Sequence, residues 1–424
     1  MLNIKLLRER PDILINDLKR RGDKEKEKWV ADFTKLDKER RQAIYKTEQD
    51  RKERNAISNE IARMVKEKKD ISFNRKEMAK VNEKIKKNEA KLAKLDGKLS
   101  FYLLRFPNIL HKSVPKGIDD SQNKEERKWG HQPKFTFRPK NHIELMEGLG
   151  MLDLGRAGKI AGARFFYMKG DAVLLHMALM KFGMDKLVEA GFTPVQPPFM
   201  MNREAYVGVT DMDDFENVMY KIEGEDLYMI ATSEHPLVAM HMKEVVPESS
   251  LPIRYAGIST NFRKEAGTHG IEDKGIFRVH QFDKVEELVL TKPEDSWEEH
   301  ERLTKTAEEI VRALELPYRV VNVCTGDIGT VAAKKYDIEA WVPSQKRYRE
   351  VISCSNCTDY QARRLNIKYG TEGEKPKGLV HTLNSTATTT RMMVAIIENL
   401  QQKDGTIKIP KALQGYMGGR KKMG

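Results

Sequence analysis

The chain has 424 residues and a formal net charge of +13, and its isoelectric point is near 9.3. Its length predicts two or three domains, because domains usually contain about 150 residues, and its basic character suggests a polyanionic partner. Three cysteines exclude a disulfide scaffold. No apolar stretch reaches the roughly 18 to 20 residues of a membrane span or resembles a signal peptide, so we expect a cytosolic protein and no membrane partner.

Two series of residues with the 3,4 spacing of a coiled-coil seam predict a long helical hairpin near the N-terminus. They cover residues 33–64 and 78–102. Because the intervening residues 68–74 form a short link, we expect antiparallel helices, with Asn74 as N-cap and Glu77 completing a capping box. The first series is polar in its middle, which predicts weaker packing there and a flexible arm.

Most of the excess positive charge lies in this predicted hairpin. Residues 24–100 contain 24 Lys or Arg against 15 Asp or Glu. A basic rod of this kind fits the grooves of a nucleic acid, and lysines without aromatic neighbours would read phosphates and shape rather than bases. An oligomerisation coiled coil, or a charge that serves only solubility, are the alternatives.

Beyond the hairpin the pattern changes to that of an α+β domain. Residues 107–139 are rich in Lys, Gly and Pro and predict a linker, and an amphipathic helix is expected at 169–190. Few helices separate the predicted strands, which favours a largely antiparallel sheet. The predicted strands are residues 227–231, 253–262, 277–288, 318–323 and 340–342. The chain has no glycine-rich phosphate loop, so a nucleotide would be held by side chains.

Charges alternate along the strand predicted at residues 277–288. Side chains of a strand alternate between its faces, so Arg278, Phe282 and Glu286 share one face, and Arg263 shares a face with Glu265. Buried charges are costly unless something binds them. This row therefore predicts a ligand floor for a phosphate, an amine and a purine ring, and an exposed charged hairpin is the alternative.

The cysteines favour a structural role over a metal site. Cys354 and Cys357 have the spacing of half a zinc site, but Cys324 is the only other cysteine in the chain. A closed zinc site normally has four ligands. We therefore expect no structural metal.

Two segments, Arg263 to Gly267 and Arg278 to Glu286, resemble motif 2 of the class II aminoacyl-tRNA synthetases. Their amino-acid sequence is similar to that of the seryl-tRNA synthetase family in particular. Further blocks with the same likeness follow in order along nearly the whole chain. They are residues 232–237, 336–345, 350–364 and 384–391.

The resemblance implies a class II synthetase fold, an antiparallel sheet flanked by helices and preceded by a long antiparallel helical hairpin. It implies two domains: a tRNA-binding arm at residues 1–112 and a catalytic domain at 113–424. The implied reaction is ATP-dependent activation of L-serine to seryl-adenylate and transfer to the 3′ end of tRNA(Ser), with release of AMP and diphosphate. The arm would recognise the long variable arm of the tRNA, and motif 1 around Pro197 and Pro198 would form a homodimer interface.

The family's ATP-binding roles can be carried over to the motif residues of this chain. By resemblance Arg263 binds the α-phosphate beside the attacking carboxylate of serine, Arg278 lies near the β- and γ-phosphates, and Arg391 takes the γ-phosphate end. Phe282 stacks on adenine and Glu265 binds its amino group. Arg263 and Arg391 are the candidate catalytic residues.

The resemblance also implies that Glu350, and with it Ser353, holds Mg²⁺ between the phosphates of ATP. These residues are three apart in the sequence. On a regular strand they would face opposite sides, so a bulge or a strand end is needed between them.

For serine, the resemblance places Thr232, Glu234 and Glu286 around the amino group and side chain, together with Arg263, and adds two residues of motif 3, Asn384 and Thr386. A pocket that hydrogen-bonds the hydroxyl rejects alanine, because alanine leaves buried polar groups unpaired. The alternatives are that Asn384 and Thr386 cap the helix expected at 391–401, and that Thr232 is a turn residue.

One departure concerns motif 3, where the spacing from Asn384 to Arg391 is one residue shorter than the family pattern. One residue rotates a helical side chain by about 100 degrees. We expect the loop to take up the difference, and the alternative is that this site is altered.

Two other functions compete with this interpretation. A synthetase-like paralog with altered or lost aminoacylation would have little use for a basic arm. A non-catalytic, nucleic-acid-binding coiled-coil protein would leave the charged motif residues without a role.

Overall fold

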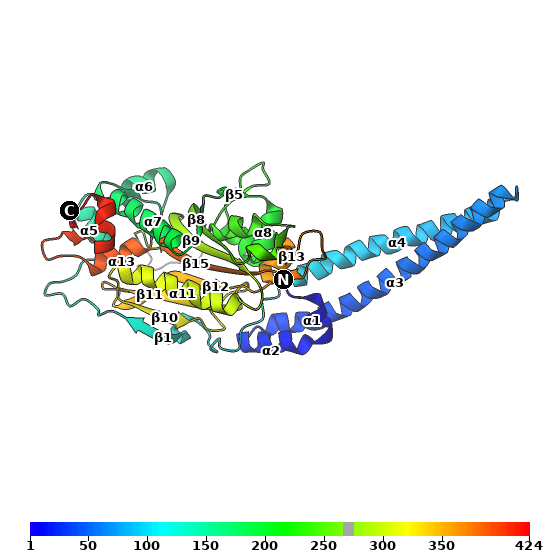
Figure 1. Cartoon of the computed structure of the whole chain (residues 1–424), viewed down its shortest axis with the longest axis horizontal. Coiled ribbons are helices and arrows are strands. Elements are labelled where there is room, and N and C mark those ends of the chain that lie inside the picture. Colours follow the sequence, from blue (N-terminus) through cyan, green and yellow to red (C-terminus); the bar gives the residue numbers. More distant parts are fainter. Residues whose placement is uncertain (266–274) are drawn as a thin grey trace. The chain divides into compact units, whose positions relative to one another are not determined.

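The structure is a computed structural model that describes residues 1–265 and 275–424. Ala266 and Gly267 of the motif 2 block lie outside the described residues. The chain forms two compact units, Leu2–Phe106 and Pro107–Gly424 (Figure 1). Each unit is described by itself.

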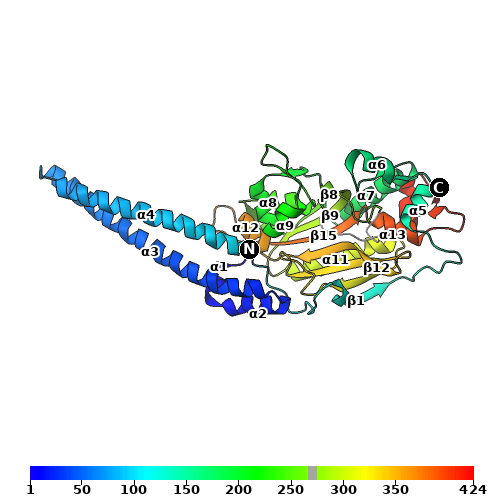
Figure 2. The ribbon, with the colours of Figure 1, turned by 180° about the vertical axis from the view of Figure 1, so that it is seen from behind.

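The first unit is helical and contains the predicted hairpin. Its helices are α1 (Ile4–Glu9), α2 (Pro11–Arg21), α3 (Lys24–Lys66) and α4 (Ser72–Leu103). Helices α3 and α4 run antiparallel, side by side, in both views (Figures 1 and 2). At 1.5 Å per residue, the 43 residues of α3 extend over about 65 Å. The seam residues predicted from the sequence are buried or half-buried along both helices, which confirms the heptad interpretation.

The hairpin packs differently at its base and in its middle. At the base, the rings of Phe33 and Tyr102 lie 5.8 and 6.1 Å from that of Phe106. In the polar middle, Asn88 Nδ2 donates to Asp50 Oδ2 at 2.7 Å, and the ion pairs Arg40–Asp96 and Arg51–Glu89 also cross between the helices. Exposed pairs of this kind contribute little stability, so the apolar base carries most of the packing energy.

The N-cap predicted for the second helix is wrong. Helix α4 begins at Ser72, two residues before Asn74. The carboxylate of Asp70 accepts hydrogen bonds from the backbone and the hydroxyl of Ser72 at 2.9 and 2.8 Å. This carboxylate already holds the first turn, so Asn74 lies inside the helix.

The second unit is built on an eight-stranded sheet in the order β1-β10-β11-β12-β15-β9-β8-β4. Neighbouring strands are antiparallel apart from the edge pair β4 and β8. In chain order the strands are β1 (Lys124–Trp129), β4 (Thr193–Val195), β8 (Ile253–Phe262), β9 (Gln281–Thr291), β10 (Tyr318–Asn322), β11 (Lys334–Val342), β12 (Arg347–Asn356) and β15 (His381–Thr389). The α+β, class II type of sheet is as expected.

Four details of the strand predictions are wrong. Residues 107–139, expected as a linker, contain the edge strand β1. The sheet also contains β12 and β15, which were not predicted because their polar residues face a cavity and hide the apolar pattern. Strand β9 begins at Gln281, so Arg278 precedes the strand. The segment predicted at 227–231 contributes only β6 (Tyr228–Met229), which pairs with β5 (Met200–Met201) outside the main sheet.

Helices cover both faces of the sheet. Helices α7 (Asp171–Glu189), close to the expected 169–190, and α11 (Ser296–Ala313) pack on one face of the central strands. On the other face, α8 (Arg203–Val209), α10 (Glu234–Ala239) and α12 (Tyr360–Leu365) surround a second apolar cluster. On this same face, the part of the central strands that lies between these three helices and β12 carries polar side chains.

Shorter elements complete the unit. The helices are α5 (His142–Gly148), α6 (Leu154–Ala161), α9 (Met212–Val218), α13 (Met392–Asn399) and α14 (Lys411–Gln414). The strands are β2 (Leu152–Asp153), β3 (Tyr167–Met168), β7 (Val245–Pro247), β13 (Lys368–Gly370), β14 (Gly378–Leu379), β16 (Ile407–Lys408) and β17 (Lys422–Met423). Within the described ranges, no helix combines the length and the apolar character needed to cross a bilayer.

Candidate active site

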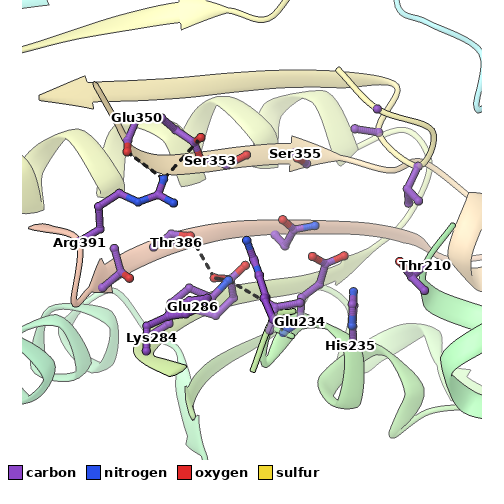
Figure 3. Close-up of a pocket in the computed structure, with 18 of the residues that line it drawn as sticks. Thr210, Glu234, His235, Lys284, Glu286, Glu350, Ser353, Ser355, Thr386 and Arg391 are labelled. Atoms are coloured by element: carbon purple, nitrogen blue, oxygen red, sulfur yellow. Dashed lines mark hydrogen bonds and ion pairs between the residues drawn. The ribbon is translucent and has the colours of Figure 1, made fainter. Parts of the chain in front are cut away.

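A cavity of about 320 Å³ lies against the central strands β9, β12 and β15. All twelve site residues predicted from the sequence line it, although they come from segments that are far apart in the chain. They are Thr232, Glu234, Arg263, Glu265, Arg278, Phe282, Glu286, Glu350, Ser353, Asn384, Thr386 and Arg391. Figure 3 shows Glu350 and Arg391 toward one end of the cavity and Glu234 and His235 toward the other.

Strand β9 supplies the floor. Its alternate residues Phe282, Lys284 and Glu286 line the cavity, as strand geometry requires. Lys284 Nζ lies 2.7 Å from Glu286 Oε2 and donates to Thr232 Oγ1 at 2.7 Å. Thr386 Oγ1 donates to the same Glu286 oxygen at 3.2 Å (Figure 3). The buried Glu286 carboxylate is therefore held from two sides, so its position is set before any ligand binds.

Glu234 begins helix α10 and is the second carboxylate at this end. Burial raises its pKa to about 7, and the nearby Glu286 carboxylate acts in the same direction. The neighbouring His235 is buried and its pKa is lowered to about 3, so it is a neutral imidazole near pH 7. Two carboxylates, one of them near its titration point, form a site for a cationic amine.

Glu350 and Ser353 face the same cavity because β12 contains a bulge. In the register with β11, Glu339 pairs with Glu350 and Ile338 pairs with Ile352, which leaves Val351 as the extra residue. Of the two possibilities predicted from the three-residue spacing, a bulge or a strand end, the structure has the bulge.

The electrostatic surroundings of these two residues differ. Burial acts to raise the pKa of Glu350, but the positive charges of Arg391 and Lys335 outweigh it and the net pKa is lowered. The hydroxyl of Ser353 contacts Asp337, whose pKa burial raises to about 7. Glu350 is thus a carboxylate at neutral pH, and its side chain is 46% exposed.

Three arginines line the cavity. Arg391 Nη1 donates to the backbone oxygen of Glu350 at 3.1 Å and lies 3.7 Å from its carboxylate. Arg278 Nη1 lies 3.4 Å from Glu265 Oε2. Arg263 Nε donates to the backbone oxygen of Ala231 at 3.2 Å. These positive charges outnumber the acidic partners nearest to them, so the arginine-lined part of the cavity favours an anion.

Phe282 offers a stacking surface beside Arg263. The guanidinium carbon of Arg263 lies 5.1 Å from the centre of the ring. A planar base can therefore stack only on the ring face that Arg263 leaves uncovered.

Asn384 and Thr386 lie within strand β15 and do not cap the following helix. Helix α13 begins at Met392, too far along the chain for either side chain to reach its first turn. In the register with β9, Thr386 pairs with Glu286 and Thr388 with Val285, so Ala387 is an extra residue. Arg391 lines the cavity with this spacing.

Several lining residues were not predicted. Among them are Thr210, Asp211, His235, Lys284, Ser355, Cys357 and the loop 328–332. Lys284 could have been found, because it lies two residues from both Phe282 and Glu286 on the predicted strand. The loop carries no charged motif, and only the tertiary structure brings it to the cavity.

The three cysteines are buried and free. Burial raises the pKa of the Cys354 and Cys357 thiols, so neither is a reactive thiolate at neutral pH. Among the residues described, no group of three or more His, Cys, Asp or Glu side chains is arranged to hold a metal ion.

Two family models match the chain. The seryl-tRNA synthetase N-terminal domain covers residues 1–110. The tRNA synthetase class II core domain, of the glycine, histidine, proline, serine and threonine type, covers residues 218–400. The first match contains the helical hairpin, and the second contains all twelve predicted site residues.

Full-length relatives are also similar. A serine–tRNA ligase of Methanocella arvoryzae is 52% identical over 99% of this chain and 99% of its own. The crystal structure of seryl-tRNA synthetase from Pyrococcus horikoshii, complexed with ATP, matches with a TM-score of 0.93 and 48% identity, over 100% of this chain and 99% of that one. The cytoplasmic serine–tRNA ligase of Naegleria fowleri, in complex with AMP, matches with a TM-score of 0.87 and 36% identity, over 100% and 98%.

Proposed function

The chain belongs to the seryl-tRNA synthetase family, and from this we propose how its residues divide the work of serine activation and transfer. The chain is a class II enzyme that uses ATP to convert L-serine to seryl-adenylate and then esterifies tRNA, releasing AMP and diphosphate. One observation carries the assignment of residues: an arginine-lined region for phosphates and a region with two carboxylates for an amine belong to the same cavity.

In adenylate formation a carboxylate oxygen of serine bonds to the α-phosphorus of ATP, and the bond from that phosphorus to the diphosphate oxygen breaks. Two anions must approach each other, so fixed cations lower the barrier. We assign Arg263 to the α-phosphate and the serine carboxylate, Arg278 to the β- and γ-phosphates, and Arg391 to the γ-phosphate. Arg263 is anchored by the Ala231 carbonyl, which limits the reorganisation needed during the reaction.

We assign adenine to the uncovered face of Phe282, with its amino group bound by Glu265. Glu265 has a backbone φ of 42°, which is unusual for a residue other than glycine. Arg164 Nη1 donates to the backbone oxygen of Glu265 at 2.7 Å and supports this conformation.

Glu350 and Ser353 fit a magnesium ion that is bound together with ATP. Glu350 is ionised, partly exposed and brought beside Ser353 by the β12 bulge. Magnesium prefers one or two carboxylates together with phosphate oxygens, and it supplies charge neutralisation between the phosphates. Omitting Mg²⁺ should abolish exchange of diphosphate into ATP.

At the other end we assign the serine ammonium group to Glu234 and Glu286. Thr386 is buried and donates to Glu286, Asn384 is buried two residues before it on the same strand, and Thr232 is held by Lys284. This set supplies anions for the amine and both donors and acceptors for the hydroxyl. Alanine, which cannot use them, should be a poor substrate.

We propose that residues 1–112 form the tRNA-binding arm and residues 113–424 the catalytic domain. On the arm, Lys38, Arg41, Gln42 and Lys46 surround Tyr45, whose side chain is 63% exposed. A second shallow depression, which shares Lys46, includes Lys84 and Lys87. This basic surface supports binding to the phosphates of a long variable arm, and Tyr45 adds an aromatic ring on which a base or ribose can stack.

We also propose a homodimer in the cytoplasm. Three apolar side chains lie exposed together on α7: Val173, Leu174 and Met177, the last of them 63% exposed. A row of this kind on a helix supports burial against a second copy of the chain. The unpaired cysteines fit a reducing compartment.

Amino-acid-dependent exchange of labelled diphosphate into ATP tests the assignment. We expect exchange with serine, weak exchange with threonine, and none with alanine or without an amino acid. A parallel assay should then show esterification of tRNA with a long variable arm. Exchange without esterification would indicate a paralog, and no serine-dependent exchange would refute the proposed function.

A further inference from the structure

Gln361 is a completely buried amide in helix α12, next to the cavity. Its Nε2 donates to Glu234 Oε1 at 2.7 Å and to the backbone oxygen of Val209 at 3.0 Å. Its Oε1 accepts a hydrogen bond from the hydroxyl of Thr382 at 2.6 Å. Both amide hydrogens and the amide oxygen therefore have partners, which is required when such a group is buried.

The orientation of this amide follows from its partners. The Val209 carbonyl can only accept a hydrogen bond, so the NH₂ group must point toward it, and the same group then faces Glu234. On the opposite side Thr382 donates to the amide oxygen. Gln361 is consequently a donor to Glu234 whether or not that carboxyl group carries a proton.

A fixed donor acts on the carboxyl group in two ways. It holds Oε1 in place, and among the described residues no hydrogen bond is made to the other oxygen, Oε2. It also favours the ionised form, because a carboxylate accepts a hydrogen bond more strongly than a carboxylic acid does. Thr382 does not line the cavity, and neither does Gln361, so neither residue touches the substrate.

We propose that Gln361, oriented by Thr382, is a positioning residue that fixes one oxygen of Glu234 in the protein and leaves the other for serine. This inference depends on the serine-binding role of Glu234 proposed above. The proposal also predicts that Gln361 affects the proton affinity of the Glu234 carboxyl group.

Several charged groups face Glu234. Glu286 opposes its ionisation, Lys284 and Arg263 favour it, and His235 is neutral. Gln361 is a donor whose contribution can be removed without changing the net charge.

The test compares Gln361→Met with the unmodified full-length enzyme in diphosphate exchange at saturating ATP. Methionine has a similar size and no polar atoms, so the variant removes the hydrogen bonds while the site stays filled. We expect the KM for serine to rise by roughly 10- to 100-fold, the range for losing a hydrogen bond to a charged group. The KM for ATP should stay within about twofold. The acidic limb of kcat/KM for serine should move to higher pH.

A matched control is Gln401→Met. Gln401 is also a buried glutamine: its Nε2 donates to the backbone oxygens of Lys140 and Glu398, and its Oε1 accepts from the Lys140 backbone. It does not line the cavity. The Gln401→Met variant should therefore lose about as much thermal stability as Gln361→Met, without a change in the KM for serine or in the pH profile.

Thr382 provides a second pair of variants in case Gln361→Met fails to fold. Thr382→Val removes the hydroxyl at nearly constant volume and should raise the KM for serine in the same direction but by less. Thr382→Ser keeps the hydroxyl and should restore the pH profile toward that of the unmodified enzyme.

Equal changes for serine and ATP, or an unchanged pH profile in both Gln361→Met and Thr382→Val, would refute the positioning role. If the unmodified chain itself shows no serine-dependent exchange, the proposed function fails instead. The two failures are therefore distinguishable.

Discussion

Serine activation is expected to depend on pH through Glu234. Burial raises the pKa of this side chain to about 7, with a further contribution from Glu286. The charges of the serine ammonium and carboxylate groups change little between pH 6 and 8. Because an ammonium ion is bound by a carboxylate and not by a neutral carboxylic acid, kcat/KM for serine should increase as the pH rises through 7.

The size of the effect follows from the fraction of Glu234 that is ionised. With a pKa of about 7, about 9% of the enzyme carries the carboxylate at pH 6 and about 91% at pH 8. This predicts a change of about tenfold in kcat/KM between those values. Below pH 6 the rate constant should fall by about tenfold for each further unit. A carboxylate with an ordinary pKa would give a nearly flat profile over the same range.

The assay is serine-dependent exchange of diphosphate into ATP at saturating ATP and Mg²⁺, with Glu234→Gln as the matched variant. Glutamine keeps an oxygen that accepts from Gln361 but cannot ionise, so this variant should have low activity and lack the acidic limb. Dividing the two profiles cancels the ionisation of ATP, which is common to both. A ratio that is constant from pH 6 to pH 8 would falsify the role assigned to Glu234.

Three further outcomes are expected. Arg263→Ala should lower exchange by about 100-fold or more, as for other transition-state cations, with unchanged tRNA affinity in a binding titration. Replacing Lys84 and Lys87 by Gln should flatten the slope of log tRNA affinity against log salt by about one to two units, and a salt-independent affinity of the unmodified chain would contradict the phosphate-binding arm. Glu287 is completely buried without a hydrogen-bond partner among the described residues, and burial raises its pKa. The unfolded chain therefore loses this proton at a lower pH than the folded chain does. As the pH rises above the ordinary pKa of a glutamate, the free energy of unfolding falls by up to about 1.4 kcal/mol per pH unit. The melting temperature of Glu287→Gln minus that of the unmodified chain should therefore increase from about pH 5 to pH 8. A constant difference would show that Glu287 ionises normally in the folded protein.

The sequence predicts the helical hairpin well because the determinants of a coiled coil are local. Seam residues recur every three or four positions, and the same positions are buried or half-buried in α3 and α4. The start of α4 was predicted at the wrong residue because two acceptors, Asp70 and Asn74, compete within five residues. The earlier one accepts the hydrogen bonds of Ser72, the first residue of the helix, a choice that local pattern does not resolve.

Strands that line the cavity are harder to predict than strands in the core. Strands β12 and β15 carry Ser, Thr, Asn and Glu on their cavity face, so they lack the apolar alternation on which strand prediction depends. The residues on the opposite face of these strands, such as Cys354 and Leu383, are buried in the core. A ligand site therefore obscures the pattern of the strands that build it.

The sequence by itself determined the family, the basic hairpin and twelve of the residues that line the cavity, because the motif blocks keep their order along the chain. It also required a bulge or a strand end between Glu350 and Ser353, since alternation along a strand cannot place residues three apart on one face, and the structure has the bulge. Only the tertiary structure decided which neutral groups hold the charged ones. Gln361 reaches Glu234 from 127 positions away, and burial together with Glu286 moves the pKa of Glu234 to about 7. Such effects depend on distance and on exclusion of water, which the order of residues does not specify.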